Sequence, residues 1–504
     1  MMAALYGDYT RDRVGMFFGL TGVQLSILVV AAMPVLWAVN ERLWASAGIA
    51  VLVWLVVFVL AVVPVRGRSA TGWLLGLVSF TAGTVLRVSR WRSKPALGVA
   101  EDLGEPDLPG VAAGVRVHDG PPQGPFNTRL AIIQDKATGV WAATAAISHA
   151  GLALADSSER DSQGRGLTVL LNACARTELI SELILQVRSV PDDGAERAEW
   201  MASHTDVAAP ELSLRVNRDM AGMLSRASVR TEAFVTIVVP EHRLARRAKE
   251  FGRGVDGRAR AMHMLMAEVE SHLRNQMAVR EVTWLTSPQL ATAVRTGFAP
   301  GDRAGIVAAL ARRANGEQIN ADVPWAQAGP AGAEQAVRHY AHDSWHSISA
   351  AVKLPARGAV LGALAPVLTP GQPGERRSLV TVFPILQATA ADRKARNAEW
   401  GADMSQTLRD RAGVKTRAKD RESQARTRGL DSKLAAGHAL VRPYAVACAT
   451  VPATMNITEF GSHLDVAIRR AGFAPLRLDM SQDAGFAAAN LPLGICLHRK
   501  GAGA

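Results

Sequence analysis

Two long stretches near the start of the chain carry no charged side chain. Residues 14–40 and 43–65 contain no Asp, Glu, Lys or Arg, and only Glu41 and Arg42 separate them. As helices that rise ~1.5 Å per residue, they would reach roughly 40 and 35 Å, more than the ~30 Å hydrocarbon core of a bilayer. The pattern therefore predicts a transmembrane hairpin over residues 1–66, with its charged turn in water.

Basic residues set the expected orientation of this hairpin. Arginines flank it at both ends, whereas the turn carries a single Arg beside a Glu. The positive-inside rule then predicts a multi-pass protein of the inner (cytoplasmic) membrane, with both termini and the remaining chain in the cytoplasm. A cleaved signal peptide is the competing interpretation, but the apolar run is longer than an h-region and a second run follows it.

Residues 69–86 form a third uncharged stretch, which is short and diluted by Gly, Ser and Thr. It either crosses the membrane as a third span or lies at the surface. Residues 66–94 hold six basic side chains and no acidic one, and each basic side chain contributes on the order of 1 kcal/mol near anionic lipid. The favoured interpretation is a basic juxtamembrane helix over residues 67–94. The expected interface residues are Trp37, Trp44, Arg66, Arg68, Arg87, Arg90, Trp91, Arg92 and Lys94.

The pattern of the remaining chain is that of a folded α+β protein. Residues 95–128 are rich in Pro and Gly and are expected to be a linker. A first cytoplasmic α+β unit is predicted over residues 129–340. It opens with a hairpin of two β-rich runs, joined by a turn that contains Gly. A helix over residues 166–187 and a buried strand over residues 229–240 follow.

A second α+β unit is predicted over residues 341–504. Its elements follow in the order strand, helix, strand, strand, helix, strand, which is the order of a split βαβ, ferredoxin-like fold. A long arginine-rich helix over residues 392–433 is expected to interrupt it. The fold class is therefore α+β, with a transmembrane hairpin and two sandwich-like units. The predicted ranges are strands 343–355, 377–389, 438–453 and 475–480, and helices 359–368 and 455–473.

The distribution of charge and cysteine argues against several kinds of binding site. The net charge of +12 resides almost entirely in residues 66–94 and residues 392–433, which argues against a broad basic surface for DNA. The three cysteines, Cys174, Cys448 and Cys496, are far apart and form no zinc or disulfide pattern. The arginine-rich segment has three interpretations: a solvated helix with internal ion pairs, a docking face for an acidic partner, or a nucleic-acid contact. The last is disfavoured because Trp400 is its one aromatic residue.

No familiar catalytic motif stands in the chain. There is no P-loop, no HExxH, no GxSxG and no GxGxxG after a strand. His339, His342, Asp343 and His346 lie close together in sequence and are the one candidate for a metal site, although a segment that runs into a strand need not bring them together. We expect no catalytic residue, no cofactor and no metal.

Four stretches carry a resemblance to the N-terminal, non-motor region of the conjugation ATPase family of the TraC class. They are DKATGVWAATAAISHAGLALAD (135–156), TELISELILQVRSVP (177–191), RRSLVTVFPILQATAADRKARNAEW (376–400) and AGFAAANLPLG (484–494). The hairpin with its basic helix resembles the PrgI-type membrane component of type IV (conjugation-like) secretion machines. The Ala-, Arg- and Gly-rich composition is compatible with an actinobacterial source, in which such fused versions occur.

The resemblance implies a role without chemistry. In that family the motor follows the segment that ends at Gly494, whereas this chain ends at Ala504. The implied function is a non-enzymatic structural subunit of a type IV secretion or DNA-transfer apparatus that docks a separate hexameric motor ATPase. Its expected partners are the membrane, that ATPase and further copies of the chain, without direct nucleic-acid contact. The candidate docking residues are Arg393, Lys394, Arg396, Arg409, Arg411, Phe486, Leu491 and Pro492.

Two other functions stay open from the sequence. One is an EccE-like membrane component of a type VII secretion core, which also combines two N-terminal spans with a soluble α/β domain. The other is a membrane-bound enzyme with an unrecognised site near His339–His346.

Overall fold

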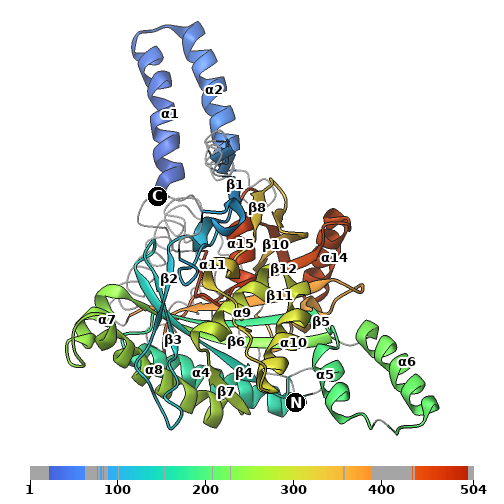
Figure 1. The fold of residues 1–504 in the computed structure, drawn as a ribbon. Coiled ribbons are helices and arrows are strands. Elements are labelled where there is room, and N and C mark those ends of the chain that lie inside the picture. Colours follow the sequence, from blue (N-terminus) through green and yellow to red (C-terminus); the bar gives the residue numbers. More distant parts are fainter. Residues whose placement is uncertain are drawn as a thin grey trace. The chain divides into compact units, whose positions relative to one another are not determined.

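The computed structural model describes residues 22–62, 76–77, 80–81, 83–84, 89–99, 102–151, 155–206, 208–227, 229–355, 358–387, 434 and 437–497 (Figure 1). The chain divides into two units. The larger unit comprises Met1–Gly7, Ser89–Gln387 and Val441–Ala504, and the smaller comprises Asp8–Val88 and Ala388–Leu440.

The smaller unit contains a helical hairpin of α1 (Gly22–Asn40) and α2 (Trp44–Val62). Arg42 takes the left-handed conformation in the turn, with φ 57°. The indole nitrogen of Trp54 donates to the carbonyl of Leu28 at 3.0 Å and so joins the two helices. Much of the apolar surface of both helices remains exposed.

As far as the structure describes them, the two helices of this hairpin have 19 residues each, a rise of ~28 Å. Nowhere in the described residues is there a helix both long enough and apolar enough to cross a membrane. The predicted membrane-spanning hairpin is therefore unsupported, and the predicted multi-pass location in the inner membrane is wrong.

The larger unit is a mixed α+β structure built on an antiparallel sheet. Among the described residues, thirteen strands join in it, in the order β1-β8-β9-β10-β12-β11-β5-β6-β4-β3-β2, with β13 beside β10 and β7 beside β4. The strands are β1 (Arg90–Arg92), β2 (Val115–Asp119), β3 (Ala131–Asp135), β4 (Val140–Ser148), β5 (Glu182–Pro191), β6 (Val229–Pro240), β7 (Glu281–Trp284), β8 (Gly332–Gln335), β9 (Tyr340–His342), β10 (Trp345–Lys353), β11 (Arg376–Pro384), β12 (Tyr444–Pro452) and β13 (Ala474–Arg477).

Two four-stranded blocks meet at the middle of this sheet. The first runs β7-β4-β6-β5 and the second runs β11-β12-β10-β13. They join through β5 and β11, where Leu183 pairs with Phe383 and Val187 pairs with Leu379. The sheet therefore continues across the boundary that the sequence analysis placed at residue 340.

Helices cover both faces of the sheet. Their bounds are α4 (Ser157–Arg176), α5 (Ala195–His204), α6 (Glu211–Ala227), α7 (Glu241–Ala248), α8 (Gly254–Gln276), α9 (Ser287–Phe298), α10 (Arg303–Ala314), α11 (Trp325–Ala328), α14 (Ile457–Arg470) and α15 (Gln482–Asn490), with 3-10 turns η1 (Pro95–Leu97), η2 (Gly110–Ala112), η3 (Pro300–Asp302) and η4 (Ala365–Leu368).

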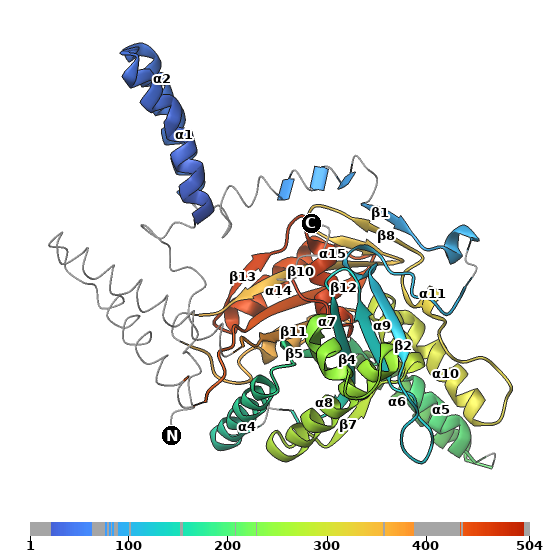
Figure 2. The ribbon, with the colours of Figure 1, turned by 90° about the vertical axis from the view of Figure 1, so that its left-hand side faces the viewer.

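One face carries two of the three hydrophobic cores. α4 and α8 lie side by side under the first block (Figure 1 and Figure 2), with Leu170 and Met262 fully buried. α14 covers the second block and buries Leu464 and Ile468. Successive residues of a strand point to opposite faces, so a strand covered on both sides is apolar throughout. β12 is an example, because Ala447 faces α14 and Val446 faces the other layer.

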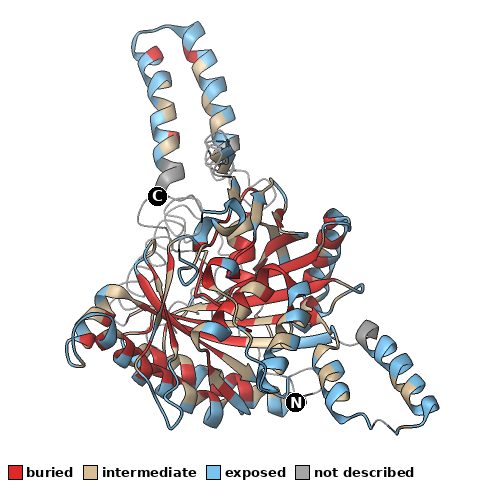
Figure 3. Cartoon of the chain, in the orientation of Figure 1, coloured by how far each residue is buried: buried red, intermediate tan, exposed pale blue. Residues whose placement is uncertain are grey.

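α9, α15 and the chain that follows α15 form the layer on the opposite face. Phe298 of α9 and Phe486 of α15 pack together, with ring centroids 5.2 Å apart. Both side chains are almost completely buried in the third core, together with Leu491 and Leu493. Figure 3 shows this concentration of buried residues along the sheet and its covering helices.

Four predicted helices differ from the structure or lie outside the described residues. The predicted helix 166–187 ends at Arg176, and β5 begins at Glu182. Of the predicted helix 359–368, only η4 is helical. Residues 90–92 of the predicted juxtamembrane helix form strand β1, because they pair with β8. The predicted helix 392–433 lies outside the described residues.

Candidate functional site

The predicted interface residues do not gather into one site. Trp37 and Trp44 are exposed near the turn of the hairpin. Trp91 alternates with the exposed Arg90 and Arg92 along β1, and the Nε of Arg90 lies 3.1 Å from Glu334. Lys94 is exposed and its backbone N–H donates to Asp107 at 2.6 Å. Arg66, Arg68 and Arg87 lie outside the described residues.

The predicted docking residues fall into two groups. Arg393, Lys394, Arg396, Arg409 and Arg411 belong to the segment outside the described residues. Phe486, Leu491 and Pro492 are buried in the layer over the sheet. A partner would reach these three only if α15 left the sheet, so we do not include them in a docking surface.

The histidines of residues 339–346 do not converge. His342 is buried between aromatic rings, with its ring centroid 4.3 Å from that of Phe486, and its Nε2 lies 2.8 Å from the hydroxyl of Ser347. Burial holds the pKa of His342 well below its usual range, and the nearby Arg376 adds to this effect. His339 and His346 are half-buried, and their rings lie 5.0 Å apart. The three residues therefore do not form a common ligand set.

A different group of acidic residues is close enough for metal binding. Within the described part of the chain, Asp192, Asp193 and Glu196 are the one group of potential ligands that come together. However, Arg303 donates to Asp193 at 2.7 Å and also contacts Glu196, which Arg230 contacts as well. The two guanidinium groups already pair with Asp193 and Glu196, so the cluster belongs to an ion-pair network at the start of α5.

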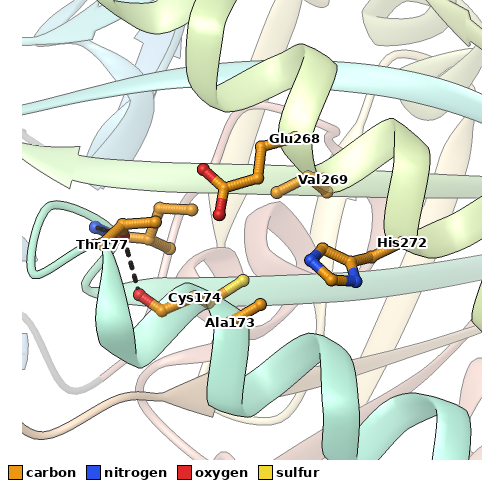
Figure 4. Close-up of a pocket in the computed structure, with 7 residues that line it drawn as sticks. Ala173, Cys174, Thr177, Glu268, Val269 and His272 are labelled. Atoms are coloured by element: carbon orange, nitrogen blue, oxygen red, sulfur yellow. Dashed lines mark hydrogen bonds between the residues drawn. The ribbon is translucent and has the colours of Figure 1, made fainter.

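A small hollow between α4 and α8 brings together residue types that serve in catalysis. Figure 4 shows Cys174 facing Glu268 and His272 across the two helices. The hollow has no room for a water molecule, and burial together with Glu268 raises the pKa of the Cys174 thiol to about 12. A thiol acts as a nucleophile only as the thiolate, so this cysteine is inert at neutral pH.

A larger hollow of about 580 Å³ lies between the start of the unit and β2. Its rim contains Asp102, Glu105 and Asp107 with Lys94 and Arg116. The Nε of Arg116 lies 3.2 Å from Glu105, and Asp107 accepts the backbone N–H of Lys94. These polar groups are engaged with one another around an open surface hollow, which identifies no ligand.

The most unusual buried group consists of two arginines at the centre of the sheet. Arg376 on β11 donates to the carbonyls of Thr296 at 2.8 Å and Gly297 at 2.6 Å, at the end of α9. Arg188 on β5 donates to the carbonyls of Ala293 and Asn490, both at 2.9 Å. Guanidinium groups thus bind the last turns of α9 and α15. The carbonyls of Thr296, Gly297 and Asn490 are among those that a helix end leaves unpaired.

The electrostatics of this group depend on one carboxylate. Glu232 lies 2.7 Å from Arg188. Burial alone would raise the pKa of Glu232, but Arg188 and Arg230 outweigh it and lower that pKa. Burial, with Arg188 nearby, lowers the pKa of Arg376 to about 9, which leaves it protonated at pH 7.

The sequence analysis did not single out these arginines, although the sequence carries a signal for them. Arg188 stands within the apolar run of residues 183–190, and Arg376 shortly precedes the apolar run of residues 379–383. Charged residues are rarely buried without partners, so an arginine in or beside such a run indicates a specific internal contact.

No protein-family model matches the sequence. No curated protein matches it at a significant level.

Proposed function

We propose that this chain is a non-enzymatic structural subunit of a conjugation-like (type IV) secretion or DNA-transfer apparatus, and that it docks a separate motor ATPase. The proposal joins the sequence resemblance to the way in which the resembling stretches pack together.

One observation carries the proposal. The four stretches that resemble the TraC class are far apart in sequence, yet the last of them contacts each of the others. Gln186 of the second stretch donates to the carbonyl of Ala489 at 2.8 Å. The Ser378 hydroxyl of the third donates to Asn490 at 2.6 Å, and the Thr144 hydroxyl of the first donates to the carbonyl of Pro492 at 2.8 Å. Such mutual packing supports the interpretation that the stretches belong to one inherited structural unit.

The strand order supports a finer description of the fold. In the first block, β4, α4, β5, β6, α8 and β7 follow the order strand, helix, strand, strand, helix, strand, and the second block has the same strand pairing. We infer two ferredoxin-like units joined edge to edge through β5 and β11. In the second unit η4 stands where the first has helix α4.

The described polar groups support a structural role over a chemical one. His342 and Arg376 bind other parts of the core, the thiol of Cys174 is buried, and the carboxylates near α5 are paired with arginines. These groups are engaged in holding the fold, whereas a reaction centre needs groups that a substrate can reach.

The test is reconstitution of the full-length chain with each free-standing conjugation-type ATPase of its own cell. We expect one of these ATPases to co-elute with the chain in a stoichiometric complex, and the chain alone to hydrolyse no ATP. ATP turnover by the pure chain, or failure of every such ATPase to bind, would overturn the proposal.

A pair of variants tests the arginine-rich segment as the docking face. The double variant Arg409→Glu, Arg411→Glu should weaken ATPase binding by about tenfold or more if these charges face the partner. The matched control is Arg312→Glu, Arg313→Glu, which reverses two exposed arginines on α10 and should leave binding unchanged.

A further inference from the structure

The connection between β5 and β6 carries two helices on the outside of the molecule. The two strands stay paired as far as Pro191 and Val229, and α5 and α6 lie between these residues in the chain. Figure 1 shows α6 at the outer edge of the larger unit, and Figure 3 shows its surface as almost entirely exposed. α5 contacts the rest of the unit through Glu196, which pairs with Arg230 of β6 and Arg303 of α10.

α6 presents an apolar stripe to solvent. Large apolar side chains recur every three or four residues and therefore share one face of the helix. Helices in globular proteins turn such a face toward a core, and a contiguous exposed one marks an interaction site. The exposed fractions are 70% for Leu212, 47% for Val216, 47% for Met220, 71% for Met223 and 45% for Leu224.

Charges of opposite sign flank the stripe on one side. Arg215 and Asp219 are one helical turn apart. At 100° per residue, both lie on the side of the stripe that is next to Leu212 and Met223. Arg215 has only an exposed ion pair, with Glu211 at 3.2 Å. Such exposed pairs contribute little, so Arg215 is available to a second partner.

We propose that the α6 stripe binds the α6 stripe of a second copy of this chain, in antiparallel orientation about a two-fold axis near Asn217. In this arrangement, the flank that carries Arg215 and Asp219 on one helix faces the same flank of the other helix across the axis. Each Arg215 then lies level with Asp219 of the other copy, so two ion pairs form at the rim of the apolar contact. A parallel two-fold pairing would put the charged flanks of the two helices on opposite sides of the contact, so Arg215 and Asp219 would form no ion pair across it.

The size of the contact sets the expected strength. A 17-residue helix is ~25 Å long, so one helix pair covers less than the ~800 Å² per partner of a standard interface. The association is therefore reversible and depends on concentration. Met220 and Met223 suit such a contact because their flexible side chains adapt to the opposing surface. The inference goes beyond the proposed function, since it concerns a different partner and does not require ATPase binding.

A charge-swap mixing experiment tests the pairing. The variants Arg215→Asp and Asp219→Arg each produce two like-charge contacts in their own pair and should self-associate more weakly than the native chain. A mixture of the two variants restores two attractive contacts. We expect mixed pairs to be about five- to tenfold tighter than either self-pair, measured by energy transfer between differently labelled full-length chains. Mixed pairs no tighter than self-pairs would overturn the proposal.

A second pair of variants tests the apolar stripe. Met220→Glu places a charge in the stripe and should abolish concentration-dependent association in sedimentation equilibrium. Ala221→Glu adds the same charge on the next exposed residue, about 100° around the helix, and should leave association intact. Equal effects of the two variants, or a native chain without any self-association, would refute the interface, whereas the ATPase reconstitution would be unaffected. Circular dichroism checks that each variant keeps its helix content.

Discussion

Arg376 is a buried charged residue that links two parts of the fold. Its guanidinium is buried on β11 and binds backbone carbonyls of α9, and within the part of the chain that the structure describes no carboxylate lies at hydrogen-bond distance from it. The arginine thus joins a strand of the second block to α9, the helix that follows the first block in the sequence. The fold gains this link by burying a charge, which is favourable only because the guanidinium finds several acceptors.

We expect Arg376→Met to lower the free energy of unfolding by about 2–4 kcal/mol, because the carbonyls of Thr296 and Gly297 lose their donors inside the core. Urea denaturation followed by circular dichroism would measure the loss. Arg313→Met removes an exposed ion pair with Asp322 and is the control, since surface pairs contribute little. Similar losses in both variants would contradict the assigned role of Arg376.

At the scale of elements, close helix packing depends on single glycines. Gly166 of α4 faces the end of α8, and a Cβ at this position would lie 2.0 Å from the carbonyl oxygen of Gln276. Gly305 of α10, in contrast, has open space around the corresponding position. The two sites therefore separate the effect of packing from that of helix propensity.

Gly166→Ala should destabilise the protein by about 1–3 kcal/mol or more, because α8 must move away from α4. Gly305→Ala should be neutral or stabilise it by up to about 1 kcal/mol, because alanine favours the helix. Thermal and urea unfolding of the two variants would measure the difference. A neutral Gly166→Ala variant would contradict the close approach of the two helices.

The element boundaries show where local patterns mislead. The predicted helix 166–187 covers the C-terminal half of α4 and part of β5, because a short apolar run fits either period. The end of α4 at Arg176 depends on the packing of β5 between β6 and β11, which the local sequence does not encode. By comparison, local residues mark the start of α9 at Ser287, because Thr286 and Gln289 form a capping box and Pro288 stands in the first turn.

For the whole molecule, buried histidine makes stability depend on pH. Burial and Arg376 hold the pKa of His342 well below that of the unfolded chain, so the unfolded state takes up a proton first as the pH falls. The native state is therefore at full stability above about pH 6.5 and loses stability below it, by up to about 1.4 kcal/mol per pH unit.

The variant His342→Gln keeps a side-chain donor near Ser347 but removes the titration. Its free energy of unfolding should fall less steeply between pH 6.5 and 5 than that of the native chain, as measured by urea denaturation at each pH. His463→Gln, on the exposed surface of α14, should leave the slope unchanged. An unchanged slope in His342→Gln would show that other groups govern the acid sensitivity.

The sequence by itself determined the local properties of this protein. It identified the α+β class, the apolar strands β4, β6, β11 and β12 and the turn that separates α1 from α2, because hydrophobic period, turn residues and helix caps act over a few neighbouring residues. The four stretches with a family resemblance were also visible in the sequence, but their mutual contacts were not.

Only the tertiary structure decided which elements meet. The β5–β11 pair unites residues almost 200 positions apart, and a strand that is apolar on both faces carries no mark of its neighbour. The same holds for the candidate sites. His339 and His342 are close in sequence but lie in different surroundings. Arg188 and Arg376, in contrast, are far apart in sequence but lie on the adjacent strands β5 and β11. Long-range pairing and core burial arise from contacts among all the elements at once.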